Sequence, residues 1–545
     1  MSGEPLTPFM DSVCERGFSP PPSKLPSPMK RSRLTNQLLR LSMSLPLLCC
    51  ISLSASERPN ILFITMDDMN YDSAGCYGAE IPGISPHIDS LAAEGFRFQY
   101  AYNQTSSCVP SRNVYQTGRY PHTNGVLSFY NVDAPFETLP EILKSNGYFT
   151  ACVNKPRDTS ITNQYKRYWD FHFIMKGPPK RHSAYYAEHF QTALNKAKKA
   201  RKPFYAVVNI ADPHKPFFND EKGTEQGFDT YAPSKIYTVD DVEIPPFLPE
   251  HPVIHEEMRN YYNSVKRGDD CVGAVLDTLK ANGLSESTVV IFVSDHGMPL
   301  PYAKSSLYPD GLRTPWILKW PGTVAAGQVD STHLISAVDF MPTVLDIAAI
   351  PHPEGLQGQS ALPLIKGQAD PSRDTVFAEF NDNAGGLAFP MRAVHTKDFL
   401  YVFNAWGTGE NTFTSASTWW QTEAVMKRLA KTDPLVAKRY DFLLHRSVEE
   451  FYDLRTDPHV LVNLIQHPDY QERIGSFRAT LENWMIETDD YLLEAFHARD
   501  NLIQLQAIYE QLDQESLKRA ETLQWKRYKN RAGGTGKNKA LYQLN

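Results

Sequence analysis

The chain has 545 residues, of which 41% are hydrophobic, and its mean hydropathy is −0.41, so a multi-span membrane protein is excluded. Its seven cysteines are too few for a disulfide scaffold. Its net charge of −7 argues against a nucleic-acid-binding protein. An anionic ligand would have to be held by a local group of cations or by a metal, because the body of the chain is acidic.

The first 56 residues, 1–56, have the pattern of a leader. Basic residues at 30–33 precede a mostly apolar stretch at 38–53 and three small residues, which is the order found in a secretory signal peptide. The true start is predicted to be Met29. A first transmembrane helix is the alternative, but Arg40 and Pro46 shorten the apolar run below the ~20 residues that a span needs. We therefore expect a secreted or periplasmic protein, lysosomal if eukaryotic, with no stable membrane span.

The chain after the leader alternates apolar strand-like runs with helical patterns. Three continuous apolar runs, at 60–66, 204–210 and 288–294, are typical of parallel strands buried on both faces. Each run ends in acidic residues, namely Asp67-Asp68, Asp212 before Pro213-His214, and Asp295 before His296. Because open α/β sheets build their sites at the carboxyl ends of parallel strands, these ends are expected to lie at one place.

Two domains and a tail are predicted. An α/β catalytic domain covers residues 57–375, and a smaller α+β subdomain with a small antiparallel sheet and long helices covers 376–530. Residues 531–545, rich in Gly, Lys and Asn, are predicted to be a disordered basic tail. Loops at 217–250 and 381–389 are expected to form the substrate pocket.

One local motif is specific. Cys108-Val109-Pro110-Ser111-Arg112, followed by Thr117-Gly118-Arg119, resembles the signature of the sulfatase family. The similarity continues in order and spacing to about residue 490, through Ser85-Pro86-His87, Asp212-Pro213-His214, Ser294-Asp295-His296-Gly297, Arg313-Thr314-Pro315 and Tyr452-Asp453-Leu454. Within the family, residues 297–304 most resemble heparan N-sulfatase (sulfamidase). The resemblance implies an alkaline-phosphatase/sulfatase-like fold, with a mixed, mostly parallel central sheet flanked by helices and a smaller C-terminal α+β domain.

The resemblance also implies a modified nucleophile. In this family the cysteine at the position of Cys108 is oxidised to formylglycine, which requires a formylglycine-generating or equivalent maturation enzyme. One hydroxyl of the formylglycine hydrate attacks sulfur and the other then expels sulfate, so one hard step becomes two easier ones. Arg112 would hold an oxygen of this hydrate.

A metal site is predicted at the acidic strand ends. Its ligands would be Asp67, Asp68, Asp295 and His296, together with the group at Cys108. Converging carboxylates repel one another unless a cation lies among them, and oxygen ligands favour Ca²⁺ or Mg²⁺. We expect Ca²⁺, with Mg²⁺ as the alternative. The family usually has Asn at the position of His296, and imidazole prefers softer ions, so the identity of the metal is open.

Three further residues match family positions that serve the sulfate and the leaving group. Lys155 and Lys304 would contact the sulfate oxygens, and His214 is the expected general acid. Arg157 stands where the family has a histidine, and arginine cannot act as a base at neutral pH. Either Arg157 supplies only charge, or another group takes the role, or the enzyme is slow.

The predicted function is a sulfohydrolase that cleaves sulfate esters or sulfamates of sulfated carbohydrates. A phosphatase or phosphonate-ester hydrolase of the same superfamily is one alternative, and it would use a Ser or Thr nucleophile. An inactive sulfatase-like glycan-binding protein is the other. With Cys108 assigned to chemistry, Cys76, Cys152 and Cys271 are expected to form no essential bridge.

Overall fold

A computed structural model describes residues 58–220, 231–384, 386–418 and 420–523. The predicted leader and the predicted basic tail lie outside these residues. The described residues belong to one compact unit of the chain. Both sheets described below lie within it, and the domain boundary at residue 375 stays a prediction.

The central sheet has eight strands in the order β4-β3-β5-β1-β6-β7-β2-β8. Their bounds are β1 (Asn60–Asp67), β2 (Phe96–Tyr102), β3 (Phe149–Val153), β4 (Phe171–Phe173), β5 (Phe204–Pro213), β6 (Thr288–Ser294), β7 (Trp316–Lys319) and β8 (Gln328–Ser336). Strand β7 runs antiparallel to its neighbours β6 and β2, and the other pairs are parallel. This confirms the predicted mixed, mostly parallel sheet.

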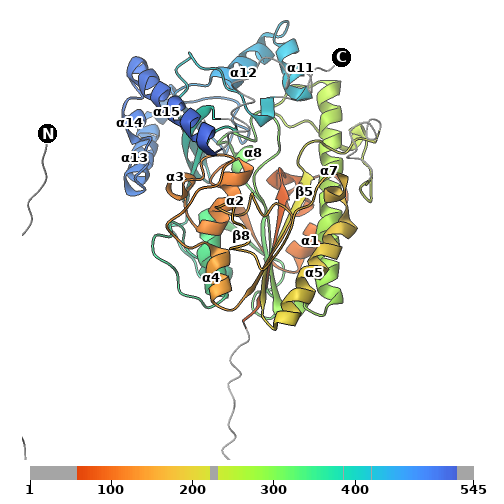
Figure 1. Cartoon of the computed structure of the whole chain (residues 1–545). Coiled ribbons are helices and arrows are strands. Elements are labelled where there is room, and N and C mark those ends of the chain that lie inside the picture. Colours follow the sequence, from red (N-terminus) through yellow and green to blue (C-terminus); the bar gives the residue numbers. More distant parts are fainter. Residues whose placement is uncertain (1–57, 221–230, 385, 419, 524–545) are drawn as a thin grey trace, which may run out of the picture. The chain divides into compact units, whose positions relative to one another are not determined.

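Helices cover both faces of this sheet (Figure 1). On one face, Leu62 and Ile64 of β1 pack in a cluster with residues of α1 (Pro86–Ala93), α5 (Ser183–Ala200) and α7 (Pro252–Ala281). On the other face, Ile61 and Phe63 pack with residues of α2 (Cys108–Thr117), α4 (Leu139–Ser145) and α9 (Phe340–Ile347). Successive strand residues point to opposite faces, so burial on both sides explains the continuous apolar runs in the sequence.

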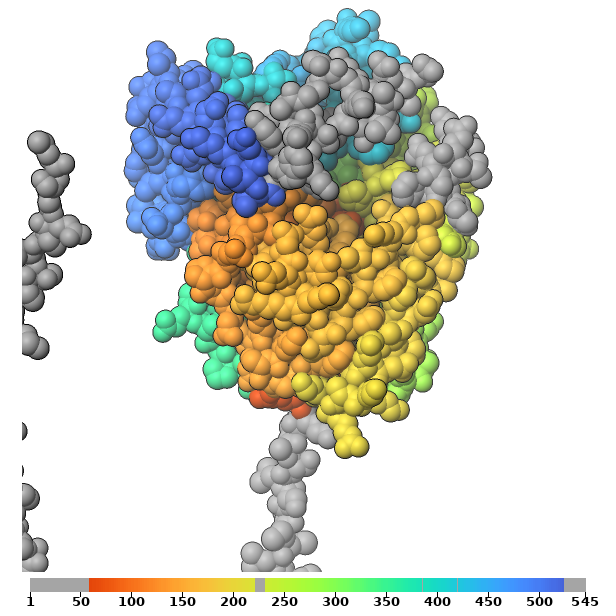
Figure 2. Space-filling view, in the orientation of Figure 1, coloured from red at the N-terminus to blue at the C-terminus, as the bar shows by residue number. Residues whose placement is uncertain are grey.

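A second sheet follows in the C-terminal part. It is antiparallel, with the order β12-β11-β10-β9, as predicted. Its strands are β9 (Thr375–Asp382), β10 (Ala388–Thr396), β11 (Phe399–Asn404) and β12 (Glu449–Asp453), and the helices after β11 are α11 (Gln421–Leu429), α12 (Pro434–His445), α13 (Gln471–Glu487), α14 (Leu493–His497) and α15 (Leu502–Leu523). The short helices α3 (Pro121–Asn124), α8 (Pro309–Leu312) and α10 (Leu362–Ile365) lie earlier in the chain. In Figure 2 the blue C-terminal helices lie above the orange-to-yellow stretch that contains α4 and α5.

The described residues bear on the predictions about disulfide bridges and membrane spans. Cys76, Cys108, Cys152 and Cys271 are all free, as expected for the three cysteines outside the motif. None of the helices in the described ranges combines the length and the apolar character needed to cross a bilayer.

A buried ionic network joins α3 to the second sheet. The imidazole of His122 pairs with Glu379 of β9, and its other nitrogen lies 3.3 Å from the carbonyl oxygen of Thr488. Arg392 of β10 pairs with Asp490 (Nη2 to Oδ1, 2.8 Å) and lies 3.7 Å from Glu379. Burial opposes a charge on the imidazole, but Glu379 outweighs it and raises the pKa of His122 above the usual 6.5. With His122 protonated, two cations balance two carboxylates.

The network predicts that stability depends on pH. Because the pKa of His122 is higher in the folded state, its contribution is fully present below the unfolded pKa, near 6.5, and is lost as pH rises through the folded pKa. His122→Gln should lower the free energy of unfolding by about 1–3 kcal/mol at acid pH and flatten its dependence on pH. Urea unfolding at a series of pH values measures both. His497→Gln, which removes an exposed imidazole paired with Glu482, is the control and should change the free energy of unfolding by less than about 1 kcal/mol.

Candidate active site

The acidic ends of β1 and β6 meet at one edge of the central sheet. Met66 pairs in register with Ser294, so the residues that follow these strands emerge side by side. The backbone N–H of Asp68 donates to Asp295 Oδ1 over 3.0 Å. Asp68 has a φ of 69°, in the left-handed region that a non-glycine residue adopts only at a cost of about 1–3 kcal/mol. The chain is thus held in a strained turn that keeps these carboxylates together.

Cys108 is the first residue of α2 and faces this edge. Its side chain is buried, and its Sγ lies 3.2 Å from His296 Nε2, 3.4 Å from Lys304 Nζ and 3.9 Å from Asp68 Oδ1. Burial raises the pKa of the thiol well above its usual value. Lys304 opposes this shift, and the nearby carboxylates add to it.

Arg112, about one helical turn further along α2, holds two of the carboxylates. Its Nη2 lies 2.8 Å from Asp295 Oδ2 and 3.4 Å from Asp67 Oδ1. Its Nη1 donates to Thr65 Oγ1 over 2.7 Å and also to Asn209. A contact between Arg112 and the oxygen of a hydrate at Cys108 stays a prediction, whereas its pairing with the carboxylates is present in the structure.

Two lysines neutralise the remaining charge. The ammonium group of Lys155 contacts Asp67 Oδ2, and Lys304 Nζ lies 2.6 Å from Asp68 Oδ1. Burial by itself raises the pKa of both carboxyl groups, but Lys155 and Lys304 outweigh it, so the pKa values of Asp67 and Asp68 lie below the usual range. At Asp295 burial prevails over Arg112 and the pKa is raised. Arg112, Lys155 and Lys304 thus supply three positive charges to three carboxylates.

His214 reaches the same carboxylates from the segment after β5. Its Nδ1 lies 2.6 Å from the carbonyl oxygen of Lys215, which can only accept, so Nδ1 carries the proton and Nε2 points to Asp68 Oδ2 at 3.9 Å. The third acidic strand end, Asp212, does not join the cluster as expected. It is buried between Arg181 and Arg267 and pairs with both.

The donor set fits a metal ion. Asp67, Asp68, Cys108 and His296 each place one ligand atom within 4.8 Å of the others, and all four are buried. His296 Nδ1 faces the carbonyl oxygen of Gly297 at 3.0 Å, so Nε2 presents its lone pair to Asp68 Oδ1 at 3.2 Å unless the ring takes a second proton. Asp68 Oδ2 is buried and accepts no hydrogen bond from any residue that the structure describes. A cation among these atoms would satisfy both groups.

Two other acidic groups in the described part of the chain are satisfied by protein cations. Asp269, beside His87, accepts hydrogen bonds from the backbone at the start of α1 and pairs with Lys266 at 3.1 Å. The group of His122, Glu379 and Asp490 is balanced by Arg392, as described above. Both groups are explained by packing and charge pairing without an ion.

A pocket of about 310 Å³ opens beside the carboxylate cluster. It is lined by Asp67, Asn154, Lys155, Pro156, Arg157, Asp158, Ile174, Met175, Lys180, Ala211 and His214. The described parts of the loops predicted to form the substrate pocket, 217–220, 231–250 and 381–389 without residue 385, supply none of these residues. Lys180, in the short 3₁₀ helix Pro178–Arg181 between β4 and α5, is a lining residue that the sequence motifs do not predict. The basic triplet Lys180-Arg181-His182 was the only sequence signal for it.

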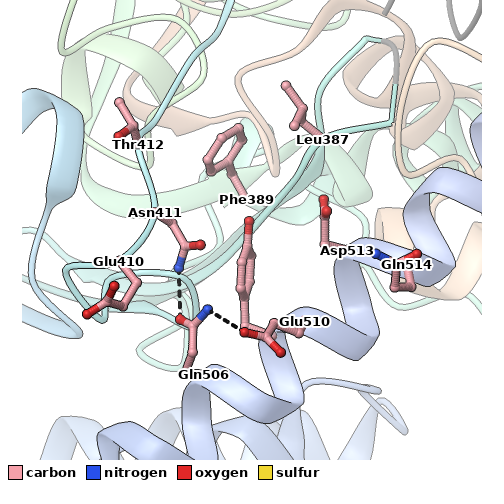
Figure 3. Close-up of a pocket in the computed structure, with 10 residues that line it drawn as sticks. Leu387, Phe389, Glu410, Asn411, Thr412, Gln506, Glu510, Asp513 and Gln514 are labelled. Carbon is pink, nitrogen blue, oxygen red and sulfur yellow. Dashed lines mark hydrogen bonds between the residues drawn. The ribbon is translucent and has the colours of Figure 1, made fainter. Parts of the chain in front are cut away.

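A second hollow of about 370 Å³ lies in the C-terminal part, between α15 and the start of β10 (Figure 3). Leu387 and Phe389 of the predicted 381–389 loop line this hollow instead. Its lining includes Glu410, Glu510 and Asp513, and none of its lining residues is a lysine, arginine or histidine. Three carboxylates repel an anion, so this hollow does not suit a sulfate group.

Comparison with known proteins gives the family. The sulfatase profile matches residues 59–350, which is more than half of the chain. The chain belongs to the sulfatase family. A second profile, the C-terminal part of N-sulphoglucosamine sulphohydrolase, matches residues 295–406. The resemblance inferred from the motifs is thereby confirmed.

Named relatives align with most of this chain. It is 28% identical to an ulvan-active sulfatase of Formosa agariphila, over 80% of this chain and 76% of that protein. It is 27% identical to N-sulphoglucosamine sulphohydrolase of Homo sapiens, over 82% of this chain and 93% of that protein. These relatives are named sulfatases, and the chain is a sulfatase-family hydrolase.

Solved structures confirm the fold of this sulfatase. A protein solved with its substrate D-glucosamine-2-N,6-O-disulfate aligns with a TM-score of 0.61 at 19% identity, over 80% of this chain and 99% of that one. The phosphonate monoester hydrolase of Agrobacterium radiobacter aligns with a TM-score of 0.59 at 17% identity, over 79% of this chain and 96% of that one. The two likenesses are nearly equal, so the fold alone does not separate sulfate from phosphonate chemistry.

The carboxylate cluster predicts a large cost for removing Arg112. Arg112→Ala leaves Asp67 and Asp295 buried with less compensating charge, and should destabilise the protein by about 3–5 kcal/mol. Chemical denaturation in the absence of added divalent metal measures this loss. Arg157→Ala removes an exposed guanidinium and should stay within about 0.5 kcal/mol of the unmodified protein. Equal stability of the two variants would contradict the assigned role of Arg112.

Proposed function

We propose that this protein is a sulfohydrolase that cleaves sulfate esters or sulfamates of sulfated carbohydrates, with formylglycine made from Cys108. The observation that carries the proposal is the position of Cys108. It is buried at the start of α2, with Lys304 and His296 within 3.4 Å of its Sγ, beside a cluster of carboxylates. The relatives named as sulfatases, including N-sulphoglucosamine sulphohydrolase, support a sulfated carbohydrate as the substrate.

A modified nucleophile suits the chemistry better than a thiol. A thiolate would form a covalent S–sulfate, and releasing it would require attack at a crowded, anionic sulfur. The formylglycine hydrate supplies a hydroxyl for attack and a second one that expels sulfate as the aldehyde forms again. The proposal therefore includes a maturation enzyme that acts on this chain, and export to the secreted, periplasmic or lysosomal compartment that the leader predicts.

The surrounding side chains have distinct tasks in this proposal. Lys155 and Lys304, already at the carboxylates, would face the sulfuryl oxygens and neutralise the charge that develops on them. His214 would serve as the general acid for the leaving oxygen or nitrogen from its Nε2, which lies at the edge of the pocket with part of the ring exposed. Burial lowers the pKa of His214 to about 4, so this role requires Nε2 to take up a proton before it passes one to the leaving group. Arg157 contributes positive charge at the pocket wall, and it does not act as a base.

A divalent metal belongs to the proposal. Asp67, Asp68, Asp295 and His296, with the modified side chain at position 108, would hold it. The three carboxylates favour a hard ion, and we propose Ca²⁺, with Mg²⁺ as the alternative. When bound, the ion supplies positive charge that polarises a sulfuryl oxygen and orients the nucleophile.

A phosphonate- or phosphate-ester hydrolase is the second candidate, because the fold aligns nearly as well with a phosphonate monoester hydrolase. The C-x-P-S-R motif at Cys108 favours the sulfatase. An inactive glycan-binding protein would explain the arginine at position 157 but not the retained nucleophile and carboxylates. Parallel assays with an aryl sulfate and the matching aryl phosphate separate the three functions.

The state of Cys108 gives the first test. In protein produced together with a formylglycine-generating enzyme, mass spectrometry of the peptide around Cys108 should find the aldehyde or its hydrate. Cys108→Ala should release no sulfate from an aryl sulfate and should keep the unfolding temperature of the parent within a few degrees. Unmodified cysteine in an active enzyme would contradict the assigned nucleophile, as would sulfate release by the variant.

Metal binding gives a second test that does not depend on turnover. Ca²⁺ at about 100 times its Kd should stabilise the protein by about 2.7 kcal/mol, visible as a higher unfolding temperature. Asp68→Asn should reduce or abolish this stabilisation, because it removes a charged ligand. Asp441→Asn, which changes an exposed carboxylate paired with His445, is the matched control and should retain it. Stabilisation by Mg²⁺ but not Ca²⁺ would reassign the ion, and no response to either would refute the site.

A further inference from the structure

The pocket beside the carboxylate cluster has more positive charge than a single sulfate group requires. Four of its lining residues, Lys155, Arg157, Lys180 and His214, are cationic or can become so. The proposed chemistry uses Lys155 and His214 at the sulfate that is hydrolysed. Lys180 has no task in the proposed chemistry and Arg157 contributes only its charge; both line the pocket, and neither belongs to the carboxylate cluster.

The position of Lys180 is fixed by its neighbour. Lys180 lies in a short 3₁₀ helix, Pro178–Arg181, and Arg181 is buried. The guanidinium of Arg181 donates to the carbonyl oxygens of Ala211 (2.8 Å) and His214 (2.7 Å) and pairs with Asp212. One buried arginine thus ties the segment of Lys180 to the segment of His214. Lys180 is held at the pocket by the structure that positions the expected general acid.

The position of Arg157 is fixed through its backbone. The carbonyl oxygen of Arg157 accepts from Asn131 Nδ2 over 3.2 Å, and the turn that contains it is closed by hydrogen bonds to the carbonyl of Lys155. The side chain of Arg157 is exposed, and it forms no hydrogen bond or ion pair with any residue that the structure describes. A planar guanidinium with an anchored backbone and no protein partner is suited to bind a carboxylate or sulfate in bidentate geometry.

Crowding of like charge supports the same conclusion. Burial together with Arg181 and Lys155 lowers the pKa of Lys180 to about 8. Asp158, the acidic lining residue outside the cluster, lies 3.9 Å from Lys155. An anion in the pocket would add negative charge next to this group of cations. The side chains of Ile174, which is 41% exposed, and Met175 add an apolar patch for the carbon face of a sugar ring.

We infer that Arg157 and Lys180 form a second anion subsite, which binds a carboxylate or a second sulfate on the same substrate. The inference rests on the proposed function and narrows its substrate to carbohydrates with at least two anionic groups. The volume of about 310 Å³ lies at the lower end of the usual range for ligand pockets, roughly 300–1,000 Å³, and suits one sugar residue with its substituents. Arg157 and Lys180 are specificity residues in this assignment.

The test compares substrates with one and two anionic groups. The substrates are an aryl sulfate, a monosulfated glucosamine, the disulfated glucosamine, and a monosulfated disaccharide that contains a uronic acid. The formylglycine-containing enzyme should have a higher kcat/KM for the last two than for the monosulfated sugar. Arg157→Gln and Lys180→Gln should each reduce this preference by about tenfold or more, mainly through KM. A preference for the disulfated glucosamine would identify a sulfate as the second anion, and a preference for the uronic-acid disaccharide would identify a carboxylate.

Lys199→Gln is the matched control, because Lys199 is an exposed lysine near the end of α5 that does not line the pocket. It should retain the full preference of the parent enzyme. The subsite is refuted if the enzyme hydrolyses the aryl sulfate without preferring doubly anionic sugars, or if either pocket variant lowers kcat/KM equally for all substrates. Failure to release sulfate from every substrate would instead overturn the proposed function, and with it the subsite. The unfolding temperature of each variant shows whether a loss of activity reflects misfolding. If one pocket variant is misfolded, the substrate preference of the other one tests the subsite.

Discussion

Asp67, Asp68 and Asp295 place three buried carboxylates at the adjoining ends of β1 and β6, and the surrounding structure is arranged to neutralise them. Helix α2 begins at Cys108 and carries Arg112 inward to Asp67 and Asp295, while Lys155 also contacts Asp67 and Lys304 pairs with Asp68, each from a separate loop. Left-handed backbone at Asp68, Asn154 and Lys155 holds these groups in place. Such strain is tolerated where charge pairing and packing over-determine the conformation. The position of Cys108 is thus set by the same interactions that keep the carboxylates buried.

This arrangement also resolves a mismatch of charge. A chain with a net charge of −7 does not attract an anionic substrate through its overall field. The cations around the carboxylate cluster and the adjoining pocket create a local positive region instead, where reduced solvent access strengthens each interaction. The larger hollow next to α15 has the opposite character, because its charged lining residues are acidic. Two pockets of similar size are therefore distinguished by their charge.

Several features were predictable from sequence because they depend on neighbours along the chain. The runs at 60–66, 204–210 and 288–294 became β1, β5 and β6, since an unbroken apolar run requires burial on both faces. Asp67, Asp68, Cys108 and His296 were grouped from motifs, and they lie together. Asp212 was not predictable in the same way. It follows a strand like the others, but Arg181 and Arg267, distant in sequence, bind it away from the cluster.

The sequence by itself determined the family, the order of the strands along the chain and the residues that meet at the strand ends. These follow from local apolar periodicity and from short motifs, whose spacing is preserved by the chain itself. Only the tertiary structure decided which walls enclose the pocket. In the structure Lys180 and Arg157 line the pocket beside the site, whereas Leu387 and Phe389 of the 381–389 segment line the acidic hollow instead. The physical reason is that segments distant in sequence enclose a pocket, and long-range contacts such as those of buried Arg181 bring them together. Local sequence patterns do not predict such contacts.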